Sequence, residues 1–179
     1  MVNSERIKSA YDRHVKLITQ RPSIAKCTQV TRVKVREGLT CDIEAKSRKL
    51  ITDVALDQGG NDQGPSPGDY FLAGLGGCLA IGYMMHAARL SVPISSLEVE
   101  IQADYDLHGL YGLNSTPAGY LAIRYIVKVE SDADEADILR VLDETDELDS
   151  ILDTFRRPIP LERELKLNRA TSTEQLEVK

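Results

Sequence analysis

An uncharged stretch in the middle of the chain, residues 70–85, constrains the fold more than any other feature. It contains four glycines and is shorter than the ~20 apolar residues that a membrane-spanning helix needs. Amphipathic strand patterns surround it on both sides. We therefore expect a helix that is buried inside a water-soluble domain, and no membrane association.

The start of this central helix is marked by a capping pattern. Ser66 suits the N-cap position, Pro67 the first helical position, and Asp69 the acidic position of a capping box. The sequence predicts a helix from this point to about Leu90.

The interior glycines of the helix need a physical reason, because each costs ~0.8–1 kcal/mol relative to alanine. Close approach of another backbone is the usual one. Gly74, Cys78 and Gly82 are four residues apart and so share one helix face. Cys78 therefore lies in a groove without neighbouring side chains, where a second backbone or a ligand can pack. Gly76 and Gly77 add to the same cost.

The central helix is apolar around most of its circumference, so it needs cover on nearly every side. One chain of 179 residues has few other segments with which to cover this helix. We expect a second subunit to complete the cover, which predicts a homodimer.

The rest of the chain predicts an α+β fold, because strands and helices do not alternate as in a doubly wound nucleotide-binding fold. We expect an N-terminal helical extension over residues 1–24, one domain over residues 25–167, and a polar C-terminal tail over residues 168–179. Besides the central helix, the expected elements are a helix over 4–20, strands near 25–36, 39–46, 49–54, 97–105 and 119–130, helices over 131–145 and 148–155, and a last strand over 161–167.

Composition excludes several classes of function. A net charge of −6 argues against a nucleic-acid surface, which needs clustered basic residues. Cys27, Cys41 and Cys78 form no C-x-x-C pair and no disulfide framework, and the histidines do not stand at zinc-ligand spacing. Cys27 and Cys41 are expected to be packing residues on strands. No signal-peptide pattern is present at the N-terminus, so a cytoplasmic location is expected.

Two segments carry a resemblance to a known family. Residues 64–78, ending in Gly-Leu-Gly-Gly-Cys, resemble the entry to the cysteine-bearing central helix of the OsmC/Ohr family. Residues 149–158 resemble the second family motif, which typically begins Cys-Pro, and the similarity extends over roughly residues 25–167. The resemblance implies an antiparallel sheet wrapped around a long buried central helix, in an intertwined homodimer with two sites at the subunit interface.

The resemblance also implies a chemistry for Cys78. Family members reduce organic hydroperoxides with a thiolate on the central helix, and the first product is a sulfenic acid. An arginine lowers the thiol pKa by favouring the charged form. Arg36 is the candidate for that role, with Arg48 nearly as good, although either one taken singly is more simply a solvated charge on a strand or turn. No cofactor and no metal are implied.

The departures from the family pattern are as informative as the matches. Asp149 stands where the resolving cysteine should be, and an aspartate cannot form a disulfide. The family glutamate falls at Gly68, with Asp69 beside it, and an anion near Cys78 would raise the thiol pKa. His86, two turns beyond Cys78, is either a base or, more simply, a satisfied histidine near the helix end.

Two functional hypotheses follow. The first is a divergent, one-cysteine hydroperoxide reductase that takes small organic hydroperoxides and is regenerated by an external thiol, with a role in oxidative stress. The second is a non-catalytic protein in which an interface pocket binds a small apolar ligand, or in which Cys78 is a slow redox sensor. Cys78 as an inert core residue is the simplest alternative to both.

Overall fold

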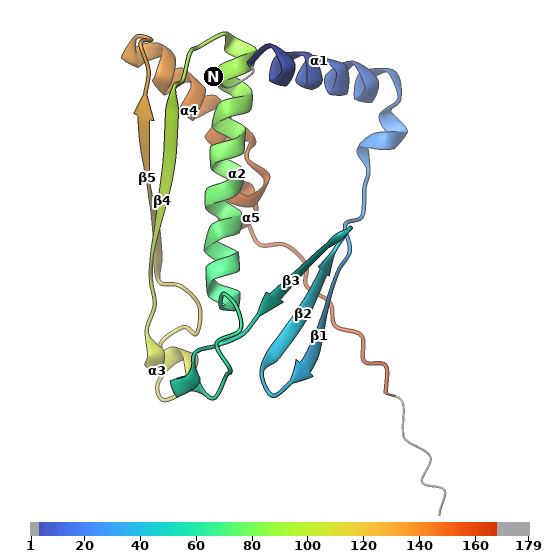
Figure 1. The fold of residues 1–179 in the computed structure, drawn as a ribbon, viewed down its shortest axis with the longest axis vertical. Helices are drawn as coiled ribbons and strands as arrows, with labels where there is room; N and C mark the ends of the chain where they lie inside the picture. Colours follow the sequence, from blue (N-terminus) through green and yellow to red (C-terminus); the bar gives the residue numbers. More distant parts are fainter. Residues whose placement is uncertain (1–3, 168–179) are drawn as a thin grey trace, which may run out of the picture.

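The computed structural model describes residues 4–167 and has an α+β fold, with a long central helix as its axis (Figure 1). The helices are α1 (Ser4–Gln20), α2 (Pro67–Leu90), α3 (Leu107–Leu110), α4 (Glu135–Leu148) and α5 (Ser150–Arg156), with 3-10 turns η1 (Pro22–Ala25) and η2 (Leu56–Gln58). The strands are β1 (Thr31–Glu37), β2 (Thr40–Ala45), β3 (Arg48–Thr52), β4 (Ser96–Asp104) and β5 (Ala122–Glu130). The expected tail over 168–179 lies outside the described residues.

The central helix α2 begins as its sequence predicts. The Asp69 amide donates to Ser66 Oγ at 3.1 Å, and the Ser66 amide donates to Asp69 Oδ2 at 2.8 Å, which completes the capping box. At the other end, Ser91 adopts a left-handed conformation and its N–H closes the last turn. The prediction of a helix from Ser66 to about Leu90 is confirmed.

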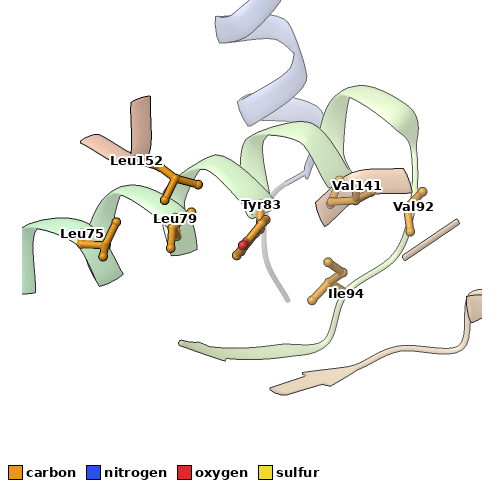
Figure 2. Packing of buried hydrophobic residues seen from close by; sticks show 8 residues of the cluster. Leu75, Leu79, Tyr83, Val92, Ile94, Val141 and Leu152 are labelled. Carbon is orange, nitrogen blue, oxygen red and sulfur yellow. The ribbon is translucent and has the colours of Figure 1, made fainter. Parts of the chain in front are cut away.

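One face of α2 forms the core of the molecule. Leu75, Leu79, Tyr83 and Ala87 recur every fourth residue, and each is at most 2% exposed. Figure 2 shows the first three on the side of α2 that faces β4, with Leu152 and Val141 arriving from the C-terminal helices. By length and composition alone α2 could cross a membrane, but the core helix of a water-soluble protein passes the same test.

Strands β4 and β5 supply the sheet on which this face packs. They pair antiparallel from Ser96↔Glu130 to Asp104↔Ala122 without a break in register. The hydroxyls of Tyr83 on α2 and Tyr125 on β5 both donate to the carboxylate of Asp146, the first at 2.7 Å. This carboxylate ties α2, β5 and α4 together.

Strands β1, β2 and β3 form a second antiparallel sheet in that order. Figure 1 shows it projecting away from the body formed by α2, β4 and β5. Its apolar face is uncovered: Val33 is 60% and Val35 is 61% exposed. Residues 4–167 thus contain two small antiparallel sheets: β4 of one packs along the central helix, whereas the other meets it through the bond from the Tyr70 hydroxyl to the Ile51 carbonyl of β3.

Three expectations about the strands need correction. Residues 161–167 do not form a strand, and Leu161 and Leu165 are 89% and 80% exposed. Their alternation suits a strand, but no strand of the described chain pairs with them. The first strand begins at Thr31, because residues 22–25 form η1 and the segment up to β1 is irregular. Cys27 consequently lies outside the sheet and is exposed.

A single chain leaves α2 open on one side, in keeping with the expectation that one chain offers too little cover, and cover by a second subunit stays a prediction. Ala73, Gly77 and Ile81, again four residues apart, are exposed, and Ile81 retains 64% of its surface. At ~100° per residue these positions lie opposite Leu79 on the helix circumference. The helix thus has a buried side and an open side.

Candidate thiol site

Cys78 lies on the border between the two sides of α2. It belongs to a row of residues four apart, Gly74, Cys78, Gly82 and His86, which faces the junction of α4 and α5. A Cβ atom at Gly82 would lie only 2.6 Å from Thr145 Cγ2 on α4. A second element therefore does approach α2 closely at Gly82, although the atom that comes near belongs to the Thr145 side chain and not to a backbone.

The other interior glycines differ in what they face. A Cβ at Gly76 would lie 3.2 Å from Ile101 Cγ1 on β4, which is a tight contact. A Cβ at Gly74 would lie 3.9 Å from Ile151 Cδ1, an ordinary contact, and at Gly77 it would meet no atom within 4 Å. Close packing within the chain thus explains Gly82 and Gly76 but not Gly77.

The thiol faces the first residues of α5. Cys78 is partly exposed, and its Sγ lies 3.8 Å from Ser150 Oγ. Asp149 is the N-cap of α5: its Oδ1 accepts from the amides of Ile151 and Leu152 at 3.0 and 2.8 Å. Asp149 is only 6% exposed, so a buried carboxylate stands beside the thiol. The structure thus brings Asp149, which the resemblance places at the position of the resolving cysteine, next to Cys78.

A hollow of about 210 Å³ opens at this point. Its wall combines one thiol, one carboxylate, one imidazole and several apolar groups. The residues that line it are Cys78, Ile81, Gly82, Met85, His86, Thr145, Leu148, Asp149 and Ser150.

The electrostatics of the hollow oppose ionisation of the thiol. Burial and the neighbouring Asp149 carboxylate raise the pKa of Cys78 above its ordinary value. The Ser150 hydroxyl and the Ile151 amide act in the other direction without reversing the shift. Among residues 4–167 of the single chain, the groups that shift the pKa of this thiol include no basic side chain. Within one chain, Cys78 is therefore a protonated thiol near neutral pH.

Arg36, the predicted activating residue, has its contacts elsewhere in the single chain. It lies on β1, where its Nε donates to Asp42 Oδ2 at 3.1 Å and its guanidinium forms an ion pair with the same carboxylate. This pairing raises the pKa of Arg36 and lowers that of Asp42. The role of Arg36 toward Cys78 stays a prediction, since it concerns an assembly of two chains.

The structure contradicts the simpler of the two predictions for His86, that of a satisfied histidine near the helix end. His86 is 7% exposed, and its Nδ1 is enclosed without a hydrogen-bond partner among the described residues. It is therefore not a satisfied histidine. Its spacing of eight from Cys78 was the sequence signal that both residues line one hollow. Nothing in the sequence marked Ser150, Thr145 or Met85 as neighbours of the thiol.

The other hollows and cysteines are weaker candidates for a functional site, because they combine fewer reactive side chains. A larger hollow, about 540 Å³, lies at the N-terminal end of α2 and is lined mostly by apolar and tyrosine side chains, together with Gln58, Ser66 and the charged Asp69. It has no cysteine or histidine, so volume alone does not make it the site. Cys41 is partly exposed on β2. Within residues 4–167, no cluster of histidine, cysteine and acidic side chains is suited to hold a metal.

The fold and this site define a class of protein: an α+β domain with one thiol on a glycine-rich central helix, next to the junction of two C-terminal helices. The family model described as OsmC-like protein matches residues 59–164, more than half of the sequence. The chain belongs to the OsmC-like protein family. Helix α1 and the β1–β3 sheet precede the matched residues.

Solved structures share the fold at low sequence identity. An OsmC-like protein from Mycoplasma pneumoniae matches with a TM-score of 0.64 and 14% identity, over 73% of this chain and 89% of that chain. An organic hydroperoxide resistance protein OsmC from Legionella pneumophila matches with a TM-score of 0.52 and 14% identity, over 73% and 92%. No curated protein sequence matches the chain. At such identities the likeness establishes the fold, and the activity must be argued from the residues.

Proposed function

We propose that the protein is a homodimeric, thiol-dependent hydroperoxide reductase that works through Cys78 alone. The observation that carries this proposal is a partly exposed thiol in the wall of a mostly apolar hollow on the central helix. A structural neighbour from Legionella pneumophila is described as an organic hydroperoxide resistance protein, which supports the same chemistry. A cytoplasmic location is part of the proposal.

The reaction needs one cysteine and an external thiol. The Cys78 thiolate attacks the outer oxygen of the hydroperoxide, the O–O bond breaks, and the alkoxide takes up a proton to leave as an alcohol. Cys78 is then a sulfenic acid. An external thiol attacks this sulfur and releases water, and a second thiol reduces the mixed disulfide and restores Cys78. Asp149 excludes an internal disulfide at the usual position.

The second subunit has a defined task in this scheme. Exposed apolar groups lie on β1 and on the open side of α2: Val33, Val35 and Ile81 are at least 60% exposed. Contacts between copies would cover them and would bring the sheet that carries Arg36 to the α2 helix of the other copy. A guanidinium near Cys78 would oppose the effect of Asp149 on the thiol pKa.

The test is the rate at which Cys78 forms a sulfenic acid with an alkyl hydroperoxide, in protein in which Cys27 and Cys41 are serine. We expect oxidation faster than that of free cysteine at the same pH, and none in Cys78→Ser. Asp149→Asn should accelerate oxidation at neutral pH, because it removes the charge that raises the thiol pKa and keeps a good N-cap for α5. Arg36→Gln should slow it.

Oxidation no faster than that of free cysteine would contradict the proposal. The raised thiol pKa specifically favours a second candidate, a protein that binds a small apolar ligand in this hollow without turnover. That function predicts equal ligand affinity in the wild type and in Cys78→Ser. The two candidates are thus separated by one substitution.

A further inference from the structure

Asp149 has one carboxylate oxygen that is bonded and one that is not. Its Oδ1 accepts from the amides of Ile151 and Leu152, as an N-cap requires. Within residues 4–167, no N–H or O–H group donates to the other oxygen, Oδ2, although Asp149 is only 6% exposed. Buried polar atoms are nearly always hydrogen-bonded. Oδ2 is therefore an acceptor for which the described chain supplies no such donor.

The free oxygen is open to the hollow beside Cys78. It lies 4.0 Å from the position that a Cβ at Gly82 would take, and Gly82, Cys78 and Asp149 all line the hollow. Among residues 4–167, the side-chain nitrogens and oxygens that lack both a partner and contact with solvent are His86 Nδ1 and Arg89 Nε. Asp149 Oδ2 is not one of these enclosed atoms, so a molecule in the hollow can reach it.

The carboxylate of Asp149 has no counter-ion within residues 4–167. The residues that line the hollow include no lysine and no arginine. Arg89 is paired with Glu144, and Arg156 donates to the backbone carbonyl of Asp146 at 2.8 Å. In a mostly apolar wall, an uncompensated carboxylate attracts a cation and repels an anion. An ammonium group would also form a charge-assisted hydrogen bond with Oδ2.

The thiol and the carboxylate are close enough for one short molecule to contact both. Cys78 Sγ lies 3.8 Å from Ser150 Oγ, in the residue that follows Asp149. The carboxylate itself acts on the thiol, because it contributes to the raised pKa of Cys78. A molecule whose sulfur bonds to Cys78 therefore needs only a short spacer to place an ammonium group at Oδ2.

The hollow suits such a spacer. Its volume of about 210 Å³ corresponds to roughly seven groups of the size of water, at ~30 Å³ each. Ile81, Met85 and Leu148 line it and offer apolar contacts to methylene groups. A two-carbon chain with sulfur at one end and nitrogen at the other fits within this volume.

We propose that the thiol that regenerates Cys78 is a short primary aminothiol, whose ammonium group pairs with Asp149 Oδ2 while its sulfur reacts at Cys78. This inference rests on the proposed function and names the class of its reductant. Asp149 then has a binding role at the position where the family pattern has a resolving cysteine. Thiols that carry a carboxylate close to the sulfur are disfavoured by the same charge.

The reaction follows from the sulfenic acid at Cys78. The sulfur of the aminothiol attacks the Cys78 sulfur, an S–S bond forms, the S–O bond breaks, and the oxygen leaves as water with the proton of the attacking thiol. A second aminothiol attacks the sulfur of the first. The mixed disulfide breaks, and Cys78 takes up a proton. Two aminothiols are thereby oxidised to one disulfide for each sulfenic acid that is reduced.

The experiment compares cysteamine with 2-mercaptoethanol, which has the same two-carbon spacer and a hydroxyl group in place of the ammonium group. The rate constant for reduction of the Cys78 sulfenic acid is measured with each, in protein in which Cys27 and Cys41 are serine. We expect the ratio of the two rate constants to be about tenfold larger with Asp149 present than in Asp149→Asn, a typical effect of one hydrogen bond to a charged group. Comparison of ratios removes the intrinsic reactivities of the two thiols and of Cys78.

Two further variants complete this experiment. Asp149→Ser also caps a helix and should lower the ratio as Asp149→Asn does. The matched control is Asp143→Asn, the same substitution at an exposed position of α4, which should keep the original ratio. An equal ratio with and without Asp149, or an equal loss in Asp143→Asn, would overturn the inference. A guanidinium of the second copy that already neutralised Asp149 would give the first of these results.

A disulfide-exchange measurement separates failure of this inference from failure of the proposed function. Reduced Cys78 is reacted with cystamine and with bis(2-hydroxyethyl) disulfide, and formation of the mixed disulfide is followed by mass spectrometry. The Cys78 thiolate attacks one sulfur, and the other leaves as a thiolate, so no hydroperoxide is needed. The preference for cystamine should again be about tenfold larger with Asp149 than in Asp149→Asn. If no hydroperoxide oxidises Cys78, the proposed function fails, and this exchange still decides whether Asp149 binds an ammonium group beside the thiol.

Discussion

The two antiparallel sheets of this chain have the same kind of sequence and opposite surroundings. Apolar and polar residues alternate along β1 and β2 of one sheet and along β4 of the other. The β4–β5 sheet packs against the central helix, and its inner residues join the apolar core. The β1–β3 sheet projects from the body with its valines exposed (Figure 1).

The two regions also differ in the kind of residue that they bury. Around α2 the core is aliphatic, with Leu75 and Leu79 almost fully enclosed. In residues 31–54, the buried positions are Thr40, Thr52 and Asp53, all polar. The first region is held by apolar burial and the second by hydrogen bonds around one carboxylate, and the apolar face of the second sheet is left exposed.

The largest effect is expected from a substitution that introduces a charge into the exposed apolar face of the β1–β3 sheet. Val35→Asp places a charge in the middle of the exposed apolar face and should weaken dimerisation about a hundredfold, because the carboxylate loses its hydration on association. Sedimentation equilibrium measures the change. The matched control is Lys34→Thr, which changes net charge by the same amount on the other face of β1.

A dimer of unchanged affinity in Val35→Asp would show that this sheet is not the interface. A monomeric wild type would end the proposal of a homodimer altogether. Secondary structure should be unchanged in both variants, because neither position is part of the buried core.

Substitution of one glycine on each side of α2 compares the packed side and the open side by their effect on stability. Gly82→Ala should destabilise the protein by about 1–3 kcal/mol, because its Cβ would lie 2.6 Å from Thr145 Cγ2 on α4. Gly77→Ala should stabilise a monomeric background by about 0.8–1 kcal/mol, because its Cβ meets no atom within 4 Å and alanine is the better helix former.

Denaturant unfolding of both glycine variants in the Val35→Asp background gives these values. The same Gly77→Ala change in the dimer reports on the other copy: a loss of stability there would mean that the partner packs closely on the open side of α2. Stabilisation by Gly82→Ala would contradict the close approach of α4.

The sequence predicts local structure well here, because local structure depends on neighbouring residues. The capping pattern at Ser66 and the alternation in residues 97–105 each led to an element that the structure confirms. The prediction of a last strand over residues 161–167 was wrong for a physical reason. A strand also needs a partner strand, and the alternation of apolar and polar residues does not say whether one lies within the same chain. Family membership was predicted correctly, from the residues around Cys78.

The candidate site was predictable in part. The spacing of Cys78, Gly82 and His86 identified one helix face, and the resemblance placed Asp149 at the resolving position. The missing bond of His86 could not be predicted, because it depends on how Tyr11 of α1 and other residues distant in the sequence pack around the ring. Such an absence is a property of three-dimensional packing that periodicity does not encode.

The smallest expected effect concerns the polar interior of the uncovered sheet. Asp53 is 1% exposed, and its Oδ2 accepts from the Thr40 hydroxyl at 2.7 Å and from the amides of Asn61 and Gln63 at 3.3 Å. Its Oδ1 accepts from the Val54 amide at 2.8 Å. The Thr40 hydroxyl and these amides lower the pKa of the carboxyl below its ordinary value.

The sign of the pH dependence follows from that shift. A carboxyl whose pKa is lowered by folding stabilises the folded state above its unfolded pKa of ~3.9, and this contribution is lost as pH falls through the folded value. Acid should therefore open β2, β3 and the 54–65 loop before it opens β4 and β5, whose core is apolar. Thr40→Val removes the main donor and should lower hydrogen-exchange protection in this region about threefold at neutral pH, because the three amides still bond the carboxylate. The β4–β5 amides are the internal reference, since an equal loss of protection in both sheets would mean that one apolar core, not two differently built regions, holds the chain.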